Sequence, residues 1–349
     1  MGSEMMGYDY EDECPNPCFG EPIDKDEQFK ALLFEEINRS HFFVSGAETG
    51  NFQNLPVKGA NARVAKWDYE GERHLIKYSN QQKEKEKLRK ELDITEQFNS
   101  STIMKSRLYE DEDNGNAALV MRYMEEGSLT KFLKEKADFL KTDQSCLKVL
   151  LKDILEGICL LHERNIVHCD IKCENIVIEK DQTGQYRAVL IDFGESVTTQ
   201  STFSCPRGIG TFIYMSPEAV RGKAGAPSDI WSFGLTICAI GWGMFPEPGV
   251  FPNPWQNSGF STVTHELALP LGFGKALPKI PTFFSSELQE FVSSCLLKAE
   301  ERPTASDLLE RLQGFQEPLL NLVVEVEKVE EVEEVENDHH DEFFGYDDA

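Results

Sequence analysis

The order of hydrophobic patterns along the chain constrains its fold more than any other feature. Two short segments of alternating residues, 62–69 and 73–79, flank a Glu-Gly-Glu turn, which predicts a β-hairpin. From Ser128 onward the pattern is mostly helical, and residues 147–163 form the clearest amphipathic stretch. A small β-rich part followed by a larger helical part predicts the α+β fold class.

The acidic charge of the chain is concentrated at its two ends. The net charge is −26, and residues 1–28 hold nine acidic side chains against one lysine, while residues 325–349 hold twelve against one. These ends are typical of solvated tails, and we regard them as candidates for binding protein partners. Because phosphate groups would be repelled, the charge argues against nucleic acid or an anionic membrane surface as the main partner.

The chain shows no pattern typical of secretion or membrane insertion. Its first residues lack a basic start followed by an apolar core, and its longest apolar run, 235–245, is shorter than the ~20 residues of a spanning helix. Nine cysteines without regular spacing favour a reducing compartment over a disulfide framework. We therefore expect a cytoplasmic protein with no membrane segment, and the nucleus remains an open alternative.

Several motifs in the second half of the chain combine acidic, basic and amide side chains at short spacings. His-Cys-Asp-Ile-Lys-Cys-Glu-Asn occupies 168–175 and Asp-Phe-Gly occupies 192–194. Gly-Thr-Phe-Ile-Tyr-Met-Ser-Pro-Glu follows at 210–218, then Asp-Ile-Trp-Ser-Phe-Gly at 229–234. In this order the motifs resemble the eukaryotic protein kinase family of the serine/threonine type over about residues 52–314. Within that family the chain looks most like the MAP kinase kinase branch.

This resemblance implies a bilobal kinase fold, in which a small β-rich N-lobe precedes a larger helical C-lobe. It divides the chain into an acidic N-terminal extension with one helix (1–40), the N-lobe (41–124), the C-lobe (125–314) and an acidic disordered C-terminal tail (315–349). The helical spacing within the extension falls on residues 29–38. The resemblance also implies a protein substrate, ATP and Mg²⁺, and it leaves the oligomeric state open.

The resemblance assigns catalytic roles to four residues. Asp170 would accept the proton of the substrate hydroxyl, and Lys172 would reach the γ-phosphate, a pattern typical of serine/threonine kinases. An isolated Asp170 would more simply be interpreted as a turn or N-cap residue. Lys77 would anchor the nucleotide phosphates and pair with Glu91 on the next helix, and the same region offers three alternative partners: Glu84, Glu86 and Glu96.

The resemblance likewise assigns a metal site and a nucleotide site. The implied Mg²⁺ ligands are Asn175 and Asp192. The segment expected to cover the phosphates keeps only the middle one of three glycines, because Val57 and Ala62 replace the other two and could weaken or reshape nucleotide binding. The implied nucleotide-binding residues are Val57, Gly59, Val64, Lys77, Met121, Tyr123 and Met124.

Two departures from the family pattern bear on activity. The family usually has an arginine before the catalytic aspartate, where it pairs with a phosphorylated activation segment, but this chain has Cys169. We therefore expect no strict dependence on phosphorylation of the hydroxyls in this segment: Thr198, Thr199, Ser201, Thr202 and Ser204. Thr95 stands where kinases usually place an apolar residue. With the altered glycine segment, these departures leave a pseudokinase that binds without catalysis as the alternative to an active kinase.

Overall fold

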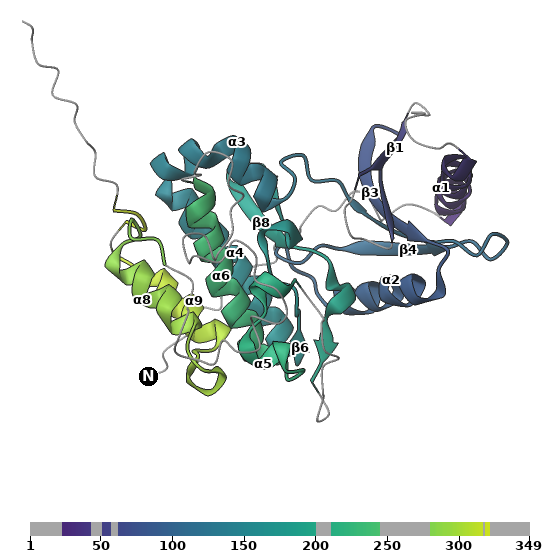
Figure 1. Cartoon of the computed structure of the whole chain (residues 1–349). Coiled ribbons are helices and arrows are strands. Elements are labelled where there is room, and N and C mark those ends of the chain that lie inside the picture. Colours follow the sequence, from purple (N-terminus) through teal and green to yellow (C-terminus); the bar gives the residue numbers. More distant parts are fainter. Residues whose placement is uncertain are drawn as a thin grey trace, which may run out of the picture.

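The chain folds into a β-rich part and a helical part that lie side by side. The computed structural model describes residues 23–42, 51–56, 62–199, 211–244, 280–316 and 318–321. Figure 1 shows the sheet with helices α1 and α2 at one end of the molecule and helices α3 to α9 at the other. This arrangement confirms the predicted α+β class and the two lobes.

The N-lobe is built on one antiparallel sheet with the strand order β1-β2-β3-β5-β4. The bounds are β1 Phe52–Leu55, β2 Arg63–Tyr69, β3 Glu72–Ser79, β4 Ser106–Glu110 and β5 Ala117–Arg122. The predicted hairpin is confirmed as β2–β3, in which Tyr69 pairs with Glu72. Its two turn residues, Glu70 and Gly71, have φ of 49° and 87°, the positive values that a two-residue type I′ hairpin requires.

The two faces of this sheet pack against different partners. Successive strand residues point to opposite faces, so Ile76 and Tyr78 share one face while Lys77 lies on the other. The first face forms a hydrophobic cluster with helix α1, Ile23–Phe42. The second face forms a cluster with helix α2, Gln82–Thr95, and with strands of the C-lobe. The sheet therefore separates the N-terminal helix from the cleft.

Helix α1 contains the predicted helical segment 29–38 and extends beyond it at both ends. Its side chains Leu33 and Ile37 are fully buried against the sheet, and the ring of Phe29 packs 4.9 Å from the ring of Trp67. The predicted boundary at residue 40 therefore cuts through a helix that belongs to the N-lobe core. The predicted boundary and the end of the helix differ because the hydrophobic face of α1 must pack against an apolar partner, here the sheet, for the helix to be stable.

The C-lobe consists of six helices and two short strand pairs in the described part of the chain. The helices are α3 Leu129–Thr142, α4 Gln144–Glu163, α5 Pro217–Val220, α6 Ala226–Met244, α8 Ser286–Cys295 and α9 Ala305–Gln313. The strand pairs are β6 Ile166–Val167 with β9 Val197–Thr198, and β7 Ile176–Lys180 with β8 Tyr186–Leu190. The predicted amphipathic segment 147–163 is confirmed within α4.

The helix α6 forms the centre of the C-lobe core and contains residues 235–244 of the longest apolar run. Nearly all of its side chains are buried, because α3, α4 and α8 surround it. Among the described residues, no helix is both long and apolar enough to cross a membrane. Leu319 and Leu320 also lie in this core, and Leu320 pairs with Phe284. The predicted tail boundary at residue 315 is therefore too early for residues 318–321, because this apolar pair is buried.

Candidate active site

The N-lobe contributes a buried ionic contact between β3 and α2. Lys77 Nζ donates hydrogen bonds to both carboxylate oxygens of Glu91, at 2.9 and 3.1 Å, and to Oδ1 of Asp192 at 3.2 Å. Burial alone would lower the pKa of Lys77, but the two carboxylates outweigh it and raise this pKa above its ordinary value. The Lys77 ammonium lowers the pKa of Asp192 against the opposing effect of burial. Lys77 and Asp192 are therefore both charged at neutral pH.

The C-lobe contributes a second polar network around Asp170. Oδ2 of Asp170 accepts hydrogen bonds from Lys172 Nζ at 2.6 Å and from Asn175 Nδ2 at 2.8 Å. Oδ1 accepts one from the backbone N–H of Thr211 at 2.6 Å, and Lys172 also donates to the Thr211 hydroxyl. These four residues come from the loop after β6 and from the start of the 211–244 segment. The structure thus brings together the predicted Asp170, Lys172 and Asn175.

Thr211 is a functional candidate that the sequence reasoning missed. It contacts both Asp170 and Lys172, yet it lies 41 residues beyond Asp170 in the chain. No spacing pattern links the threonine of the motif at 210–218 to the motif at 168–175. The sequence signal that could have pointed to Thr211 is its position directly after Gly210, at the start of the motif.

The buried Asp229 fixes the backbone of the catalytic loop. Its side chain is 1% exposed and accepts hydrogen bonds from the backbone N–H groups of His168 and Cys169, at 2.8 and 2.9 Å. Cys169 has a φ of 66°, a left-handed conformation that is unfavourable for a residue with a side chain. The two bonds to Asp229 help to hold this conformation.

The segment that carries Asp192 is held on its C-lobe side by a backbone hydrogen bond and a buried ring. The backbone N–H of Ile191 donates to the Asn175 carbonyl at 3.0 Å, so the two predicted metal ligands are anchored to each other. Asp192 itself has φ 68° and ψ 69°, again left-handed. The following Phe193 is fully buried, with its ring centroid 5.0 Å from that of His168.

Thr95 occupies a buried position behind this segment, where the family pattern favours an apolar side chain. It is 2% exposed. Its hydroxyl donates to the Leu92 carbonyl at 3.1 Å and lies 3.0 Å from the hydroxyl of Ser106 on β4. Both polar groups are therefore satisfied, so the departure at Thr95 does not leave an unpaired polar atom in the N-lobe.

The predicted nucleotide-pocket residues are partly assembled. Met121 and Met124 belong to an apolar cluster that joins the N-lobe sheet to Val177 on β7 and Val189 on β8. Val64 lies on β2 opposite Lys77, and Tyr123 follows β5 with its backbone N–H bonded to the Arg73 carbonyl at 3.0 Å. The other two predicted residues, Val57 and Gly59, lie outside the described residues.

The donor atoms present fit a magnesium ion that would be bound partly by the protein and partly by phosphate oxygens. Both hydrogens of the Asn175 amide are directed at Asp170, to its carbonyl and to its carboxylate, which leaves Oδ1 of Asn175 for a cation. Asp192 is ionised and its side chain keeps 45% of its surface exposed. In the described parts of the chain, no three His, Cys, Asp or Glu side chains form a metal cluster. Mg²⁺ commonly binds through one or two carboxylates plus substrate phosphates, and this site matches that pattern.

A buried ion pair away from the cleft stabilises the C-lobe. Arg302 donates from two nitrogens to the two carboxylate oxygens of Glu218, at 2.5 and 3.0 Å, and its side chain is fully buried. Burial would raise the pKa of Glu218, but Arg302 outweighs it and lowers this pKa below its ordinary value. This buried pair is therefore a structural contact that joins α5 to the segment before α9.

Comparisons with known proteins agree with this geometry. A family model described as the protein kinase domain matches residues 59–312. Mitogen-activated protein kinase kinase 2 of Arabidopsis thaliana is 34% identical over 203 residues, which cover 57% of this chain and 52% of that protein. Mitogen-activated protein kinase kinase 1c of Physcomitrium patens is 34% identical over 211 residues, covering 58% and 57%. Mitogen-activated protein kinase kinase kinase 17 of Arabidopsis thaliana is 29% identical over 228 residues, covering 64% and 57%. The chain spans about half the length of these relatives.

Proposed function

The chain belongs to the protein kinase domain family, and from this premise we propose that it is an ATP-dependent protein kinase acting on Ser or Thr hydroxyls. The proposal rests on one observation, the two networks of polar side chains around Lys77 and Asp170. Lys77 joins Glu91 to Asp192, and Asp170 joins Lys172 to Asn175. Phosphoryl transfer needs positioned phosphates, neutralised charge and an oriented hydroxyl, and these two networks supply residues for each.

Each network has a distinct task in the proposed reaction. Lys77, held by Glu91, binds the nucleotide phosphates from the N-lobe side. Asp170 accepts the proton of the substrate hydroxyl, and Lys172 neutralises charge on the transferred phosphoryl group. Mg²⁺, held by Asn175 and Asp192 when bound, supplies further charge neutralisation at the phosphates. Thr211 positions Asp170 and Lys172 through its backbone N–H and its hydroxyl.

We also propose that activity does not strictly require phosphorylation of the activation segment. Cys169 replaces the arginine that would receive the phosphate, so a phosphorylated activation segment would lack its main cationic partner. Two of the five candidate hydroxyls, Thr198 and Thr199, lie at the end of β9. A variant with all five candidates changed to Ala should keep at least half of the wild-type kcat. Loss of activity in a variant that still folds would contradict this proposal.

The names of the relatives support a proposal for the class of protein substrate. Their names describe kinases that act on other kinases, at two successive levels. We therefore propose that the protein substrate of this chain is itself a protein kinase. We further propose a cytoplasmic location and binding of protein partners by the acidic tails, both of which rest on the sequence alone.

The decisive experiment measures phosphate transfer by the purified full chain. The protein is incubated with Mg²⁺, γ-labelled ATP and a generic basic protein substrate, beside the variant Asp170→Asn. Loss of the proton acceptor should reduce transfer by at least about 10²-fold, in line with the usual contribution of general base catalysis. Equal transfer by both proteins would place the activity elsewhere. No transfer by either, with nucleotide still bound, would favour the pseudokinase alternative.

A further inference from the structure

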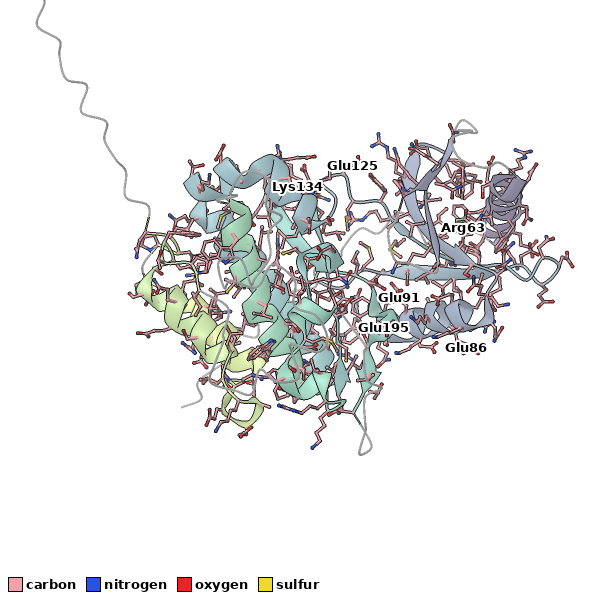
Figure 2. The ribbon with its side chains drawn as sticks, viewed as in Figure 1. Arg63, Glu86, Glu91, Glu125, Lys134 and Glu195 are labelled. Atoms are coloured by element: carbon pink, nitrogen blue, oxygen red, sulfur yellow. The ribbon has the colours of Figure 1, made fainter. Side chains whose placement is uncertain are left out.

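One face of helix α2 is directed at the segment that follows Asp192. Lys87, Lys90 and Glu91 lie on that face, because residues three and four apart in a helix are neighbours. Lys87 Nζ donates to Oε1 of Glu195 at 2.6 Å, and Lys90 Nζ donates to the Gly194 carbonyl at 3.2 Å. In Figure 2 the labelled Glu195 lies beside α2 near the Glu91 end of the helix, with Glu86 farther along it.

The Lys87–Glu195 ion pair is more enclosed than an ordinary surface pair. The two side chains are 33% and 32% exposed. The Lys87 stem packs over Gly194, since its Cβ lies 3.9 Å from the position that a Gly194 side chain would occupy. The hydrogen bond to Glu195 is the main cause that raises the pKa of Lys87. Exposed pairs often contribute nothing measurable, but a packed and partly desolvated pair between two elements is stronger.

The segment attached by this pair needs external support. Asp192 has a left-handed backbone, which is costly for a residue other than glycine and persists only when the surroundings enforce it. Asp192 is followed by a single turn, Phe193–Glu195, which packs against α2. Glu195 is the last residue of that turn, so its ion pair closes the turn onto the same helix that supplies Glu91. Lys77 and Glu91 hold one end of the segment, and Lys87 holds the other.

We propose that Lys87 and Glu195 are positioning residues that hold the metal-binding segment against α2 without phosphorylation. In the family pattern an arginine and a phosphate order this region, but here that arginine is replaced by Cys169. The carboxylate of Glu195 supplies a permanent negative charge, and Lys87 supplies its cation. The catalytic consequence rests on the proposed kinase function, whereas the structural consequence does not.

The test uses charge reversal in the full chain. The variants are Lys87→Glu, Glu195→Lys and the double exchange, with Lys87→Arg as the conservative change. The matched control is Arg89→Glu, which breaks another ion pair of α2, the one with Glu110 on β4, away from this segment. For each protein we measure kcat, the KM for MgATP and the amide hydrogen exchange of a peptide covering residues 190–197.

Each single reversal should lower kcat by about tenfold and speed exchange of the peptide by a similar factor, as expected for residues in direct contact. The double exchange and Lys87→Arg should return both quantities to within about threefold of wild type. Arg89→Glu should leave both unchanged. A purely structural role in helix stability would affect Arg89→Glu equally and would not be rescued by exchange of the charges.

The failure of this proposal can be distinguished from failure of the kinase function. If the wild type transfers no more phosphate than Asp170→Asn, the kinase function fails, but exchange still decides whether Lys87 and Glu195 hold the segment. Unchanged exchange in both single reversals overturns the proposal. A double exchange as impaired as the single variants, or a control as impaired as Lys87→Glu, also overturns it.

Discussion

The packing of helix α1 on the sheet can be tested with two adjacent leucines. Leu33 is fully buried in the cluster between α1 and the sheet, whereas Leu32, the next residue, is 36% exposed. Both are leucines in the same helix, and substitution by alanine has the same small effect on helix propensity at each site. The difference between Leu33→Ala and Leu32→Ala therefore measures the contact with the sheet.

The expected size of this difference follows from the buried atoms. Leucine to alanine removes three carbon atoms, which at ~0.8 kcal/mol per buried methylene lowers the free energy of unfolding by about 2.4 kcal/mol. The cavity left beside Ile76 and Tyr78 adds to this value, so we expect about 2.5–4 kcal/mol for Leu33→Ala. Solvent can fill the space vacated at Leu32, so we expect about 1 kcal/mol there.

The assay is urea denaturation of the full chain combined with amide hydrogen exchange of the β2 and β3 peptides. Leu33→Ala should lower the denaturation midpoint and speed exchange in these strands, while Leu32→Ala should change both only slightly. Equal effects of the two substitutions would refute the reasoning, because α1 would then contribute nothing specific to the N-lobe core.

Three further predictions concern stability. Arg302→Ala leaves Glu218 without its cation and should lower the free energy of unfolding by about 3–5 kcal/mol in urea denaturation. Because the folded-state pKa of Glu218 is depressed, the pair stabilises the fold above the ordinary pKa of 4.5 and the effect is lost in acid; an equal loss at pH 3 and pH 7 would contradict this. Gly241→Ala places a Cβ 2.6 Å from Cζ of Phe284 and should cost about 1–3 kcal/mol, so a thermally unchanged variant would be inconsistent. Burial lowers the pKa of His74 in the folded state, so the unfolded chain binds a proton more readily and the free energy of unfolding falls as the pH drops below 6.5. His74→Phe should reduce this fall between pH 7 and pH 5, as measured by urea denaturation.

Local patterns in the sequence were sufficient to predict the β2–β3 hairpin and the helical segment within α1, but not strands β1 and β4. The alternating segments predicted the β2–β3 hairpin, and its Glu70-Gly71 turn supplies the positive φ values. The motif order also pointed to Asp170 and Asp192, which the structure places in adjoining networks through the contact between Ile191 and Asn175. These features were predictable because each depends on a few neighbouring residues, or on spacings that the family resemblance fixes.

Contacts between distant segments were not predictable. Lys87 is one of several lysines in a charged helix, and only tertiary packing brings it to Glu195, 108 residues away. Thr211 reaches Asp170 for the same reason. Thr95 appeared as a polar misfit because its partner, Ser106, lies on β4, and a propensity argument considers one side chain at a time.

The register of strand β3 connects the packing of helix α1 with the position of Lys77. Ile76 and Tyr78 face α1, while Lys77 between them faces Glu91. Because side chains alternate along a strand, a shift of one residue would move Lys77 beneath α1 and bring Ile76 or Tyr78 into the cleft. Burial of Leu33 and Ile37 against the first face therefore also selects the register that directs Lys77 toward Glu91. Helix α1 lies outside the matched kinase domain, and we expect its packing to influence the position of Lys77 through the register of β3.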